Sequence, residues 1–440
     1  MTQRQTDQTP PFYQSRPQMP STLAMLTMLR QAMTDPASVI PATVYDDWAL
    51  KLPGPSSPVI ITHPDDVRHV LLDKGDVFGR NRQLRLMMRR AWGDGLGAAD
   101  GESWLQQHRA ATPAFRPQAV ETATATMAEV TKRISRAWPT DQSIELGTAI
   151  GRIVAEIVMT TLLTGLDDVD FDELVRDIPH FVREVTTFGL LDMAPVSDKL
   201  LDRLRGIGNS PQQARLRALV DRLVTARASP PDRVQDIPAL MRGVGPLADN
   251  VLGFMPAGYE TSALAAAWAI YLLALFPDWQ DAVRAEALNA ENGGDRLTTL
   301  PIARQVAQEV LRLYPPAPIL VRAAMKPTEL RGYKLRPGQI VMIPVFAIHR
   351  HRQLWEHPDT FDPARFSASA TYDRAAYLPF GAGPRMCIAA SFALAEITVI
   401  MSELVKAFEF LPTGPAPEVS LKTTTHSRNG LHVIAHKRTL

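Results

Sequence analysis

The stretch Leu-Pro-Phe-Gly-Ala-Gly-Pro-Arg-Met-Cys-Ile-Ala, residues 378–389, decides how the rest of the chain is understood. It contains Cys387, the only cysteine among 440 residues, and two glycines just before it. Glycine lets a backbone turn tightly and approach a ligand closely because it has no Cβ. Apolar residues then recur at helical spacing, so we expect Cys387 at the N-terminus of a helix. The positive end of that helix and the nearby Arg385 favour a thiolate, and together these features favour a metal ligand over a buried structural cysteine.

Residues 380–387, Phe-Gly-Ala-Gly-Pro-Arg-Met-Cys, resemble the haem-binding signature of the cytochrome P450 family, Phe-x-x-Gly-x-Arg-x-Cys. The resemblance implies haem b, iron protoporphyrin IX, with Cys387 as the axial iron ligand and with Phe380, Gly381 and Arg385 in the haem site. The family usually has glycine two residues after the cysteine, where this chain has Ala389. This change leaves ligation intact and affects only how closely the following helix packs on the porphyrin.

The composition is that of an ordinary soluble enzyme, with 45% hydrophobic and 21% charged residues. The 47 Lys and Arg residues and 46 Asp and Glu residues leave a net charge of +1, which gives no reason to expect nucleic-acid binding. A single cysteine excludes an intramolecular disulfide. No apolar run approaches the roughly 18 residues of a transmembrane helix, and the polar N-terminus does not resemble a signal peptide. We therefore expect a cytoplasmic, monomeric protein without a membrane anchor.

The hydrophobic periodicity predicts a mainly α protein with small β-sheets, an α+β class, and the resemblance implies the cytochrome P450 fold. Length alone allows two or three domains of about 100–200 residues. No linker divides the sequence, however, so we expect an N-terminal arm at 1–20 and one large domain at 21–440. The segment 76–101 has no regular pattern, and by resemblance it is the loop that closes over the substrate. The expected helices are 23–33, one from His63 to near Gly75, 101–115, 118–137, 144–164, 170–187, 197–228 with a break, 245–277 and 301–313, and the expected strands are 59–62, 317–321 and parts of 411–433.

A second site signal is the pair Trp104 and His108, which share a helix face because they are four residues apart. By itself such a pair is more often core packing. The family places an aromatic and a basic residue at this spacing to bind a haem propionate. Its usual basic residue is Arg, whereas here His108 holds the position and Arg109 follows, so both remain candidates. Arg322 resembles the second propionate ligand, and Arg385 is another.

Within the longest apolar helix lies Pro-Ala-Gly-Tyr-Glu-Thr-Ser, residues 256–262. Glycine costs about 1 kcal/mol and proline about 3 kcal/mol in a helix interior, so a functional distortion is expected there. The run Ala257-Gly258-Tyr259-Glu260-Thr261 resembles the family's oxygen-activation motif, which implies catalytic roles for Gly258, Glu260 and Thr261. Adjacent helix residues point about 100° apart, so Thr261 is expected to face the haem while Glu260 points towards a solvent channel. Pro256 departs from the motif and predicts a kink; the alternative is a distortion that serves only packing.

The pair Glu309 and Arg312 is nearly uninformative alone, because such i,i+3 pairs are common on solvated helices. The later run Phe-Asp-Pro-Ala-Arg-Phe, residues 361–366, gives it meaning by resemblance. The resemblance implies a buried charge triad of Glu309, Arg312 and Arg365 that supports the cysteine loop and does not touch the substrate.

By resemblance the chain is a haem-thiolate monooxygenase that hydroxylates a mainly apolar small molecule with O2. Because it ends soon after the haem domain, we expect electrons from a separate ferredoxin or flavodoxin with its reductase, docking on a basic face near Arg109 and Arg385. The alternatives are a peroxide-using or non-oxidative haem-thiolate enzyme, which the retained acid–alcohol pair disfavours, and a non-catalytic haem sensor. The residues expected around the substrate are Leu86, Met87, Phe181, Val185, Phe188, Leu190, Leu191, Leu252, Ala257, Ala317, Ile319 and Thr424.

Overall fold

The protein is described by a computed structural model over most of its length. Three sequence predictions, the helix at 23–33 and the candidate pocket residues Phe188 and Leu190–Leu191, lie outside the described residues. The described residues are 10–13, 36–53, 57–73, 76–186, 197–207, 210–227, 236–290 and 297–438.

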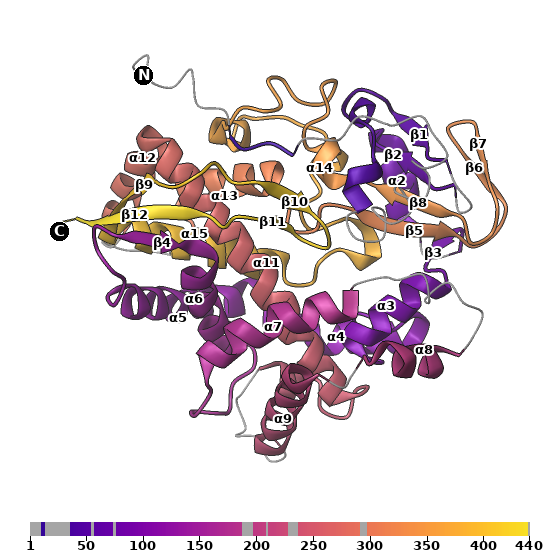
Figure 1. The fold of residues 1–440 in the computed structure, drawn as a ribbon, viewed down its shortest axis with the longest axis horizontal. Coiled ribbons are helices and arrows are strands. Elements are labelled where there is room, and N and C mark those ends of the chain that lie inside the picture. Colours follow the sequence, from indigo (N-terminus) through magenta and orange to yellow (C-terminus); the bar gives the residue numbers. More distant parts are fainter. Residues whose placement is uncertain are drawn as a thin grey trace.

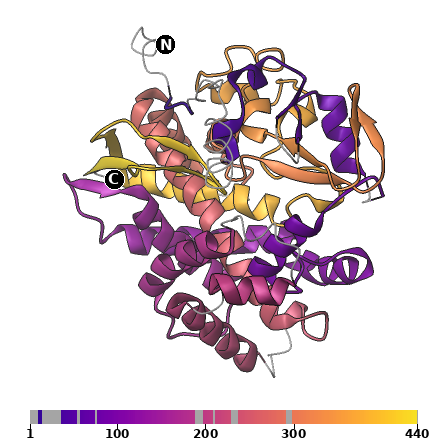
Figure 2. The same ribbon diagram turned by 45° about the vertical axis from the view of Figure 1, so that its right-hand side comes forward.

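The helical body is built around α11 (Leu247–Leu275), which crosses the middle of the molecule in both ribbon views (Figures 1 and 2). It is apolar on almost all sides, and a helix of that kind is stable only when other elements cover it. By length and composition alone it would be able to cross a membrane, but 72% of its most apolar window is buried inside the protein. It packs against α6, α13 and α15. The other helices are α2 (Pro64–Leu72), α3 (Arg82–Trp92), α4 (Gly101–Ala111), α5 (Pro117–Ser135), α6 (Leu146–Thr161), α7 (Phe171–Thr186), α8 (Asp198–Arg205), α9 (Pro211–Ala226), α10 (Ile237–Leu240), α12 (Pro277–Asn289), α13 (Pro301–Leu313), α14 (Val345–Ile348) and α15 (Ala390–Ala407).

The main sheet lies to the right of α11 in Figure 1 and has the strand order β1-β2-β8-β5-β3. Its pairing of β3 with β5, in the register Phe78 opposite Ala324, brings the chain near residue 80 beside the chain near residue 322. These strands are β1 (Ala49–Lys51), β2 (Val59–Ile61), β3 (Phe78–Gly79), β5 (Leu320–Ala324) and β8 (Ile340–Ile343). The smaller sheets pair β6 (Thr328–Leu330) with β7 (Tyr333–Leu335), β10 (Val419–Leu421) with β11 (Thr425–Ser427), and β12 (His432–Lys437) with both β4 (Ser143–Glu145) and β9 (Phe408–Pro412).

This mainly α architecture with small sheets confirms the predicted fold class, and α7, α11 and α13 match their predicted ranges closely. The predicted helix at 101–115 is regular only to Ala111, after which Pro113 and its neighbours form a 3₁₀ turn. The strand expected at 317–321 begins three residues later, at Leu320.

The prediction that 76–101 is irregular is wrong for its central part. Residues 82–92 form α3, which begins at Asn81, whose side chain accepts a hydrogen bond from the Leu84 N–H at 3.0 Å. The helical periodicity of this segment is not visible in the sequence, because arginine occupies buried as well as exposed positions. Arg90 is buried and paired with Asp202, although its residue type suggests a surface position. A charged side chain that snorkels or pairs thus breaks the simple apolar pattern.

Of the expected N-terminal arm the structure describes residues 10–13. Tyr13 is only 9% exposed and packs edge-on against Phe346. The Tyr314 hydroxyl donates to the Pro11 carbonyl at 2.7 Å. Pro10–Tyr13 is therefore part of the packed body.

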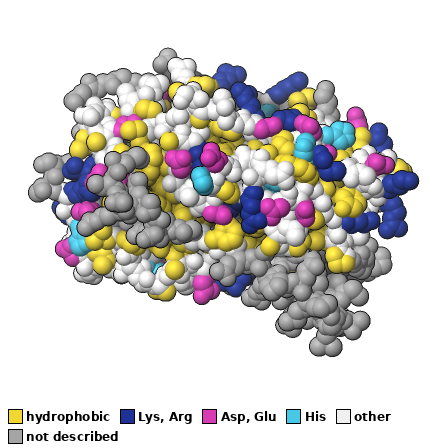
Figure 3. Space-filling view, turned by 90° about the horizontal axis from the view of Figure 1, so that it is seen from above, with side chains coloured by type: hydrophobic (Ala, Val, Ile, Leu, Met, Phe, Trp, Pro, Cys, Tyr) yellow, Lys and Arg dark blue, Asp and Glu magenta, His cyan; other side chains and the backbone are white. Residues whose placement is uncertain are grey.

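Charges on the face seen from above in Figure 3 are mixed, with Lys and Arg side chains interspersed among Asp and Glu. This agrees with the net charge of +1, because no single sign of charge dominates that face.

Candidate active site

The cysteine loop is a tight turn that only glycine permits. The Cys387 N–H donates to the Phe380 carbonyl at 2.9 Å, which closes the loop. Gly381 and Gly383 have positive φ values of 71° and 75°. A Cβ on Gly383 would lie 2.0 Å from the carbonyl oxygen of Leu71, so α2 passes directly against this position. The loop therefore places Cys387 by backbone geometry, as the glycine pattern predicted.

Cys387 is accessible to solvent although protein atoms crowd around its side chain. Burial raises the pKa of the Cys387 thiol, while a hydrogen bond from the Ala389 backbone lowers it. The Arg385 guanidinium donates to the Ala99 carbonyl at 2.8 Å and to Asp100 at 2.7 Å, so its effect on the Cys387 thiol stays a prediction. A bound iron would itself deprotonate the ligating thiol.

One face of α11 borders accessible space although most of the helix is buried. Ala257 is exposed and Thr261 and Leu264 are half-buried, and their spacing of four and three residues places them on one face. The Thr261 hydroxyl donates to the Ala257 carbonyl at 2.8 Å, which leaves its oxygen able to accept a further hydrogen bond.

The two neighbours of Thr261 point to different elements. Glu260 accepts a hydrogen bond from the Thr424 hydroxyl at 2.8 Å, between β10 and β11. Ser262 is buried and hydrogen-bonded to Glu396 of α15, the helix that follows the cysteine. These contacts fix the rotation of α11 about its axis, so Thr261 lies on the face between the hairpin and the cysteine helix.

Gly258 has a packing reason in this structure. A Cβ at this position would lie 3.3 Å from Cγ2 of Val158 on α6, tighter than ordinary van der Waals contact. The helical assignment of α11 continues through Pro256 without a break. Close packing against α6 therefore explains why residue 258 is glycine. Packing alone does not explain why the face of α11 that carries Thr261 is accessible.

Glu260 is the acid whose environment suits proton transfer. Burial raises the pKa of its carboxyl group, and the hydrogen bond from Thr424 and the charge of Arg183 on α7 lower it. A carboxyl group with a raised pKa exchanges protons more readily near neutral pH. The hydroxyl of Thr424, expected to touch the substrate, is committed to this carboxylate.

Positive charge gathers at one edge of the site, around Arg385. Its guanidinium lies 4.3 Å from the centroid of the Trp104 ring, and that ring lies 4.9 Å from the His108 ring. Burial and the charges of Arg80 and Arg322 lower the pKa of Arg385 to about 10, although Asp100 opposes them. Three buried or half-buried arginines beside one carboxylate form an unbalanced cation cluster, which an anionic group would stabilise.

The environments of His108 and Arg109 differ. Burial and the charge of Arg385 lower the pKa of His108, so His108 borders the cluster, whereas Arg109 is exposed. Burial and Arg80 also lower the pKa of Arg322. Sequence reasoning missed Arg80, because only the pairing of β3 with β5 brings it beside Arg322.

The donor set fits haem. One cysteine residue is accessible, the cation cluster suits two propionate carboxylates, and Ala257 and Ala317 offer accessible apolar surface. Among the described residues no group of three or more His, Cys, Asp or Glu is arranged to hold a metal ion.

The predicted charge triad is brought together behind the cysteine loop. Glu309 and Arg312 are fully buried and share two hydrogen bonds of 2.7 Å, while the Arg365 Nε lies 3.6 Å from Glu309. The missed link to the cysteine loop is His349. Its Nδ1 bonds the Arg312 carbonyl at 2.9 Å, and its Nε2 accepts from the Leu378 N–H at 2.7 Å. Burial lowers the pKa of His349 to about 3, so its neutral ring makes both bonds at physiological pH.

The predicted pocket residues divide into two groups. Phe181, Val185 and Leu252 belong to the main hydrophobic core, which is their default structural role. Leu86 is buried on α3, whereas Met87 and Ile319 are half-buried and Ala317 is exposed. The accessible members are those able to meet a substrate.

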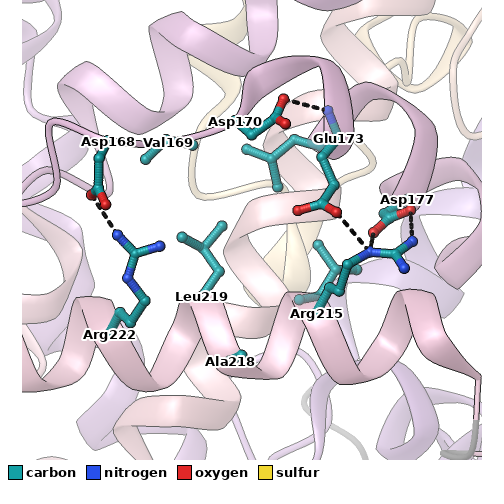
Figure 4. Close-up of a pocket in the computed structure, with 11 residues that line it drawn as sticks. Asp168, Val169, Asp170, Glu173, Asp177, Arg215, Ala218, Leu219 and Arg222 are labelled. Atoms are coloured by element: carbon teal, nitrogen blue, oxygen red, sulfur yellow. Dashed lines mark hydrogen bonds and ion pairs between the residues drawn. The ribbon is translucent and has the colours of Figure 1, made fainter.

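A separate hollow of about 210 Å³ lies between α7 and α9, and none of the predicted site residues lines it (Figure 4). Its charges are paired internally: Arg215 contacts Asp177 at 2.7 Å and Glu173 at 2.9 Å, and Arg222 pairs with Asp168. It is a groove between two ion-paired helices and contains none of the chemistry of the cysteine loop.

Comparison with known proteins agrees with this geometry. The cytochrome P450 family profile matches residues 43–433. The chain is 30% identical to the cyclooctat-9-en-7-ol 5-monooxygenase of Streptomyces melanosporofaciens, over 82% of this chain and 81% of that protein. It is 27% identical to the cytokinin hydroxylase of Arabidopsis thaliana, over 81% of this chain and 74% of that protein. It is also 28% identical to the putative cytochrome P450 137 of Mycobacterium tuberculosis, over 71% of this chain and 66% of that protein.

Proposed function

Because this chain belongs to the cytochrome P450 family and is a haem-thiolate monooxygenase, we propose that it hydroxylates a mainly apolar small molecule. The observation that carries the proposal is the accessible apolar surface of Ala257, on the same face of α11 as Thr261, together with the exposed Ala317. The similar Streptomyces protein is named for an alcohol whose skeleton is mostly hydrocarbon, which supports terpenoid-like compounds as the first substrates to screen. Lipids, steroids and aromatic compounds follow.

The residues have separate tasks in this proposal. Bound haem b supplies O2 activation, which electron donation from the Cys387 thiolate assists. His108, Arg322 and Arg385, together with Arg80, hold the propionates, and Phe380 and Gly381 shape the loop beneath the porphyrin.

Proton delivery would use two side chains of α11. Thr261 holds a water molecule or a proton at its hydroxyl oxygen, and Glu260 passes protons inward from the side of the β10–β11 hairpin. Thr261 lies on the accessible face of α11, whereas Glu260 contacts the β10–β11 hairpin. The two side chains therefore point in the different directions that these two roles require.

Electrons come from a separate ferredoxin or flavodoxin with its reductase, and the protein acts as a cytoplasmic monomer that binds neither nucleic acid nor membrane. Exposed Arg109 and Arg116 and the 50% exposed Met386 support a docking face near the cysteine loop. Arg385 is not part of a free basic face, because it is bound to Asp100 and stacked on Trp104.

The test combines a spectral screen with turnover. A substrate is expected to shift the absorption of the oxidised protein and to stimulate NAD(P)H consumption by the protein with its redox partner. In Thr261→Ala, substrate affinity should stay nearly unchanged while product per NAD(P)H falls and peroxide rises. Unchanged coupling would contradict the role of Thr261. Turnover supported by peroxide alone, at a rate that redox partners do not exceed, would instead favour the peroxide-using alternative.

A further inference from the structure

Three consecutive threonines lie where the turn of the β10–β11 hairpin meets β11, and each contacts a different element: Thr423 and Thr424 belong to the turn, and Thr425 is the first residue of β11. Thr425 is buried and anchors the turn, because its hydroxyl donates to the Pro315 carbonyl at 2.5 Å and its carbonyl accepts from the Trp268 indole at 3.3 Å. Thr423 donates to the Thr186 hydroxyl at the end of α7, at 3.1 Å. Thr424 donates to the Glu260 carboxylate on α11, at 2.8 Å. The turn thus links Glu260 of α11 to α7.

Helix α7 acts on the same carboxylate by a second route. It carries Arg183, whose charge favours the ionised form of Glu260, one turn before Thr186. On α11 itself, Tyr259 lies beside Glu260, and the Glu260 charge contributes to the raised pKa of this phenol. The hairpin contributes the neutral hydroxyl of Thr424 and, on β11, the titratable ring of His426, whose Nδ1 lies 3.1 Å from the Thr424 carbonyl oxygen.

A displacement of α7 would therefore change two interactions at once. It would break the bond between Thr423 and Thr186, and it would alter the distance from Arg183 to Glu260. Because Thr425 remains fixed to the core, the turn has one rigid end and one end that follows α7. Helix α7 packs on both α3 and α11.

We propose that Thr424 is a positioning residue that fixes the orientation and proton affinity of the Glu260 carboxyl group, and that Thr423 ties this orientation to the seating of α7. The proposal rests on the proposed function, in which Glu260 passes protons. It makes proton delivery dependent on how α7 lies over the bound substrate.

The experiment titrates the Glu260 carboxyl directly in the haem-loaded protein. Protein labelled with ¹³C at the glutamate carboxyl carbon is examined by NMR in the diamagnetic reduced carbonyl complex, and Glu260→Gln identifies the Glu260 signal. Thr424→Val keeps the side-chain shape and removes the donor. Loss of a hydrogen bond to a charged group should raise the Glu260 titration midpoint by about one pH unit. Thr424→Ser should restore the midpoint, and Thr423→Val should move it less, because the Thr424 bond remains.

A titration curve of Thr424→Val that superimposes on that of the wild type overturns the proposal, as does a serine variant that behaves like the valine variant. A midpoint in Thr423→Val that is unmoved removes the tie to α7. Product per NAD(P)H in Glu260→Gln is measured alongside as a function of pH. If that variant retains wild-type coupling, the proton-passing role fails, while the titration of the Thr424 variants still decides the positioning role.

Discussion

Glu309→Gln isolates the electrostatic part of the buried triad, because glutamine keeps the volume of glutamate and removes only the charge. The Glu309 carboxylate accepts from Arg312 Nε and Nη2 at 2.7 Å each and from the Asp362 N–H at 2.8 Å. Both Glu309 and Arg312 are 0% exposed, so water cannot replace the lost acceptor. The amide of glutamine would present N–H groups to one of the Arg312 donors.

The expected cost follows from this geometry. Removing one partner of a buried ion pair costs about 3–5 kcal/mol, and a whole domain is stable by only about 5–15 kcal/mol. The remaining donors of Arg312 bond the His349, Pro358 and Thr360 carbonyls, so its charge cannot move away to solvent. We therefore expect a lower midpoint of urea unfolding with an unchanged slope, and faster loss of haem, read from the reduced carbonyl spectrum.

Glu156→Gln is the matched control. Glu156 also lies between two arginines, Arg133 and Arg152, but their side chains are 52% and 31% exposed. Pairs with exposed partners contribute about 0–1 kcal/mol, so this variant should unfold almost like the wild type. Equal losses of stability in the two variants, or a Glu309→Gln protein that is as stable as the wild type, would refute the reasoning about burial.

Three further predictions concern the site. Cys387→Ser should abolish the thiolate-type spectrum of the reduced carbonyl complex, and its survival would overturn the ligand assignment, because the chain has no other cysteine. His108→Ala should accelerate transfer of haem to an acceptor protein, whereas Arg109→Ala, at an exposed position, should not; the opposite order would move the propionate contact by one residue. The pKa of His349 is lowered to about 3, so this residue binds fewer protons in the folded than in the unfolded protein between about pH 3 and pH 6.5. Its contribution to the free energy of unfolding is therefore complete above about pH 6.5. It falls by about 1.4 kcal/mol per pH unit as the pH decreases towards 3. The free energy of unfolding measured from pH 7 to 4 should fall less steeply in His349→Gln, and parallel curves would contradict this.

Several features of the site could be predicted from the sequence because they depend on neighbouring residues. The glycines of the cysteine loop, the shared face of Trp104 and His108, and the pair Glu309 and Arg312 all follow from turn geometry or helical spacing. The apolar run 245–277 likewise predicted the long apolar helix α11.

Other features were decided only by the tertiary structure, because they join segments far apart in the chain. The pairing of β3 with β5 places Arg80 beside Arg322, and the side chain of Arg385 donates to Asp100. His349 connects the triad to the cysteine loop, and the Thr424 hydroxyl donates a hydrogen bond to the Glu260 carboxylate. In each case a buried donor or charge must find an acceptor, and the packing of distant elements determines which acceptor lies within reach.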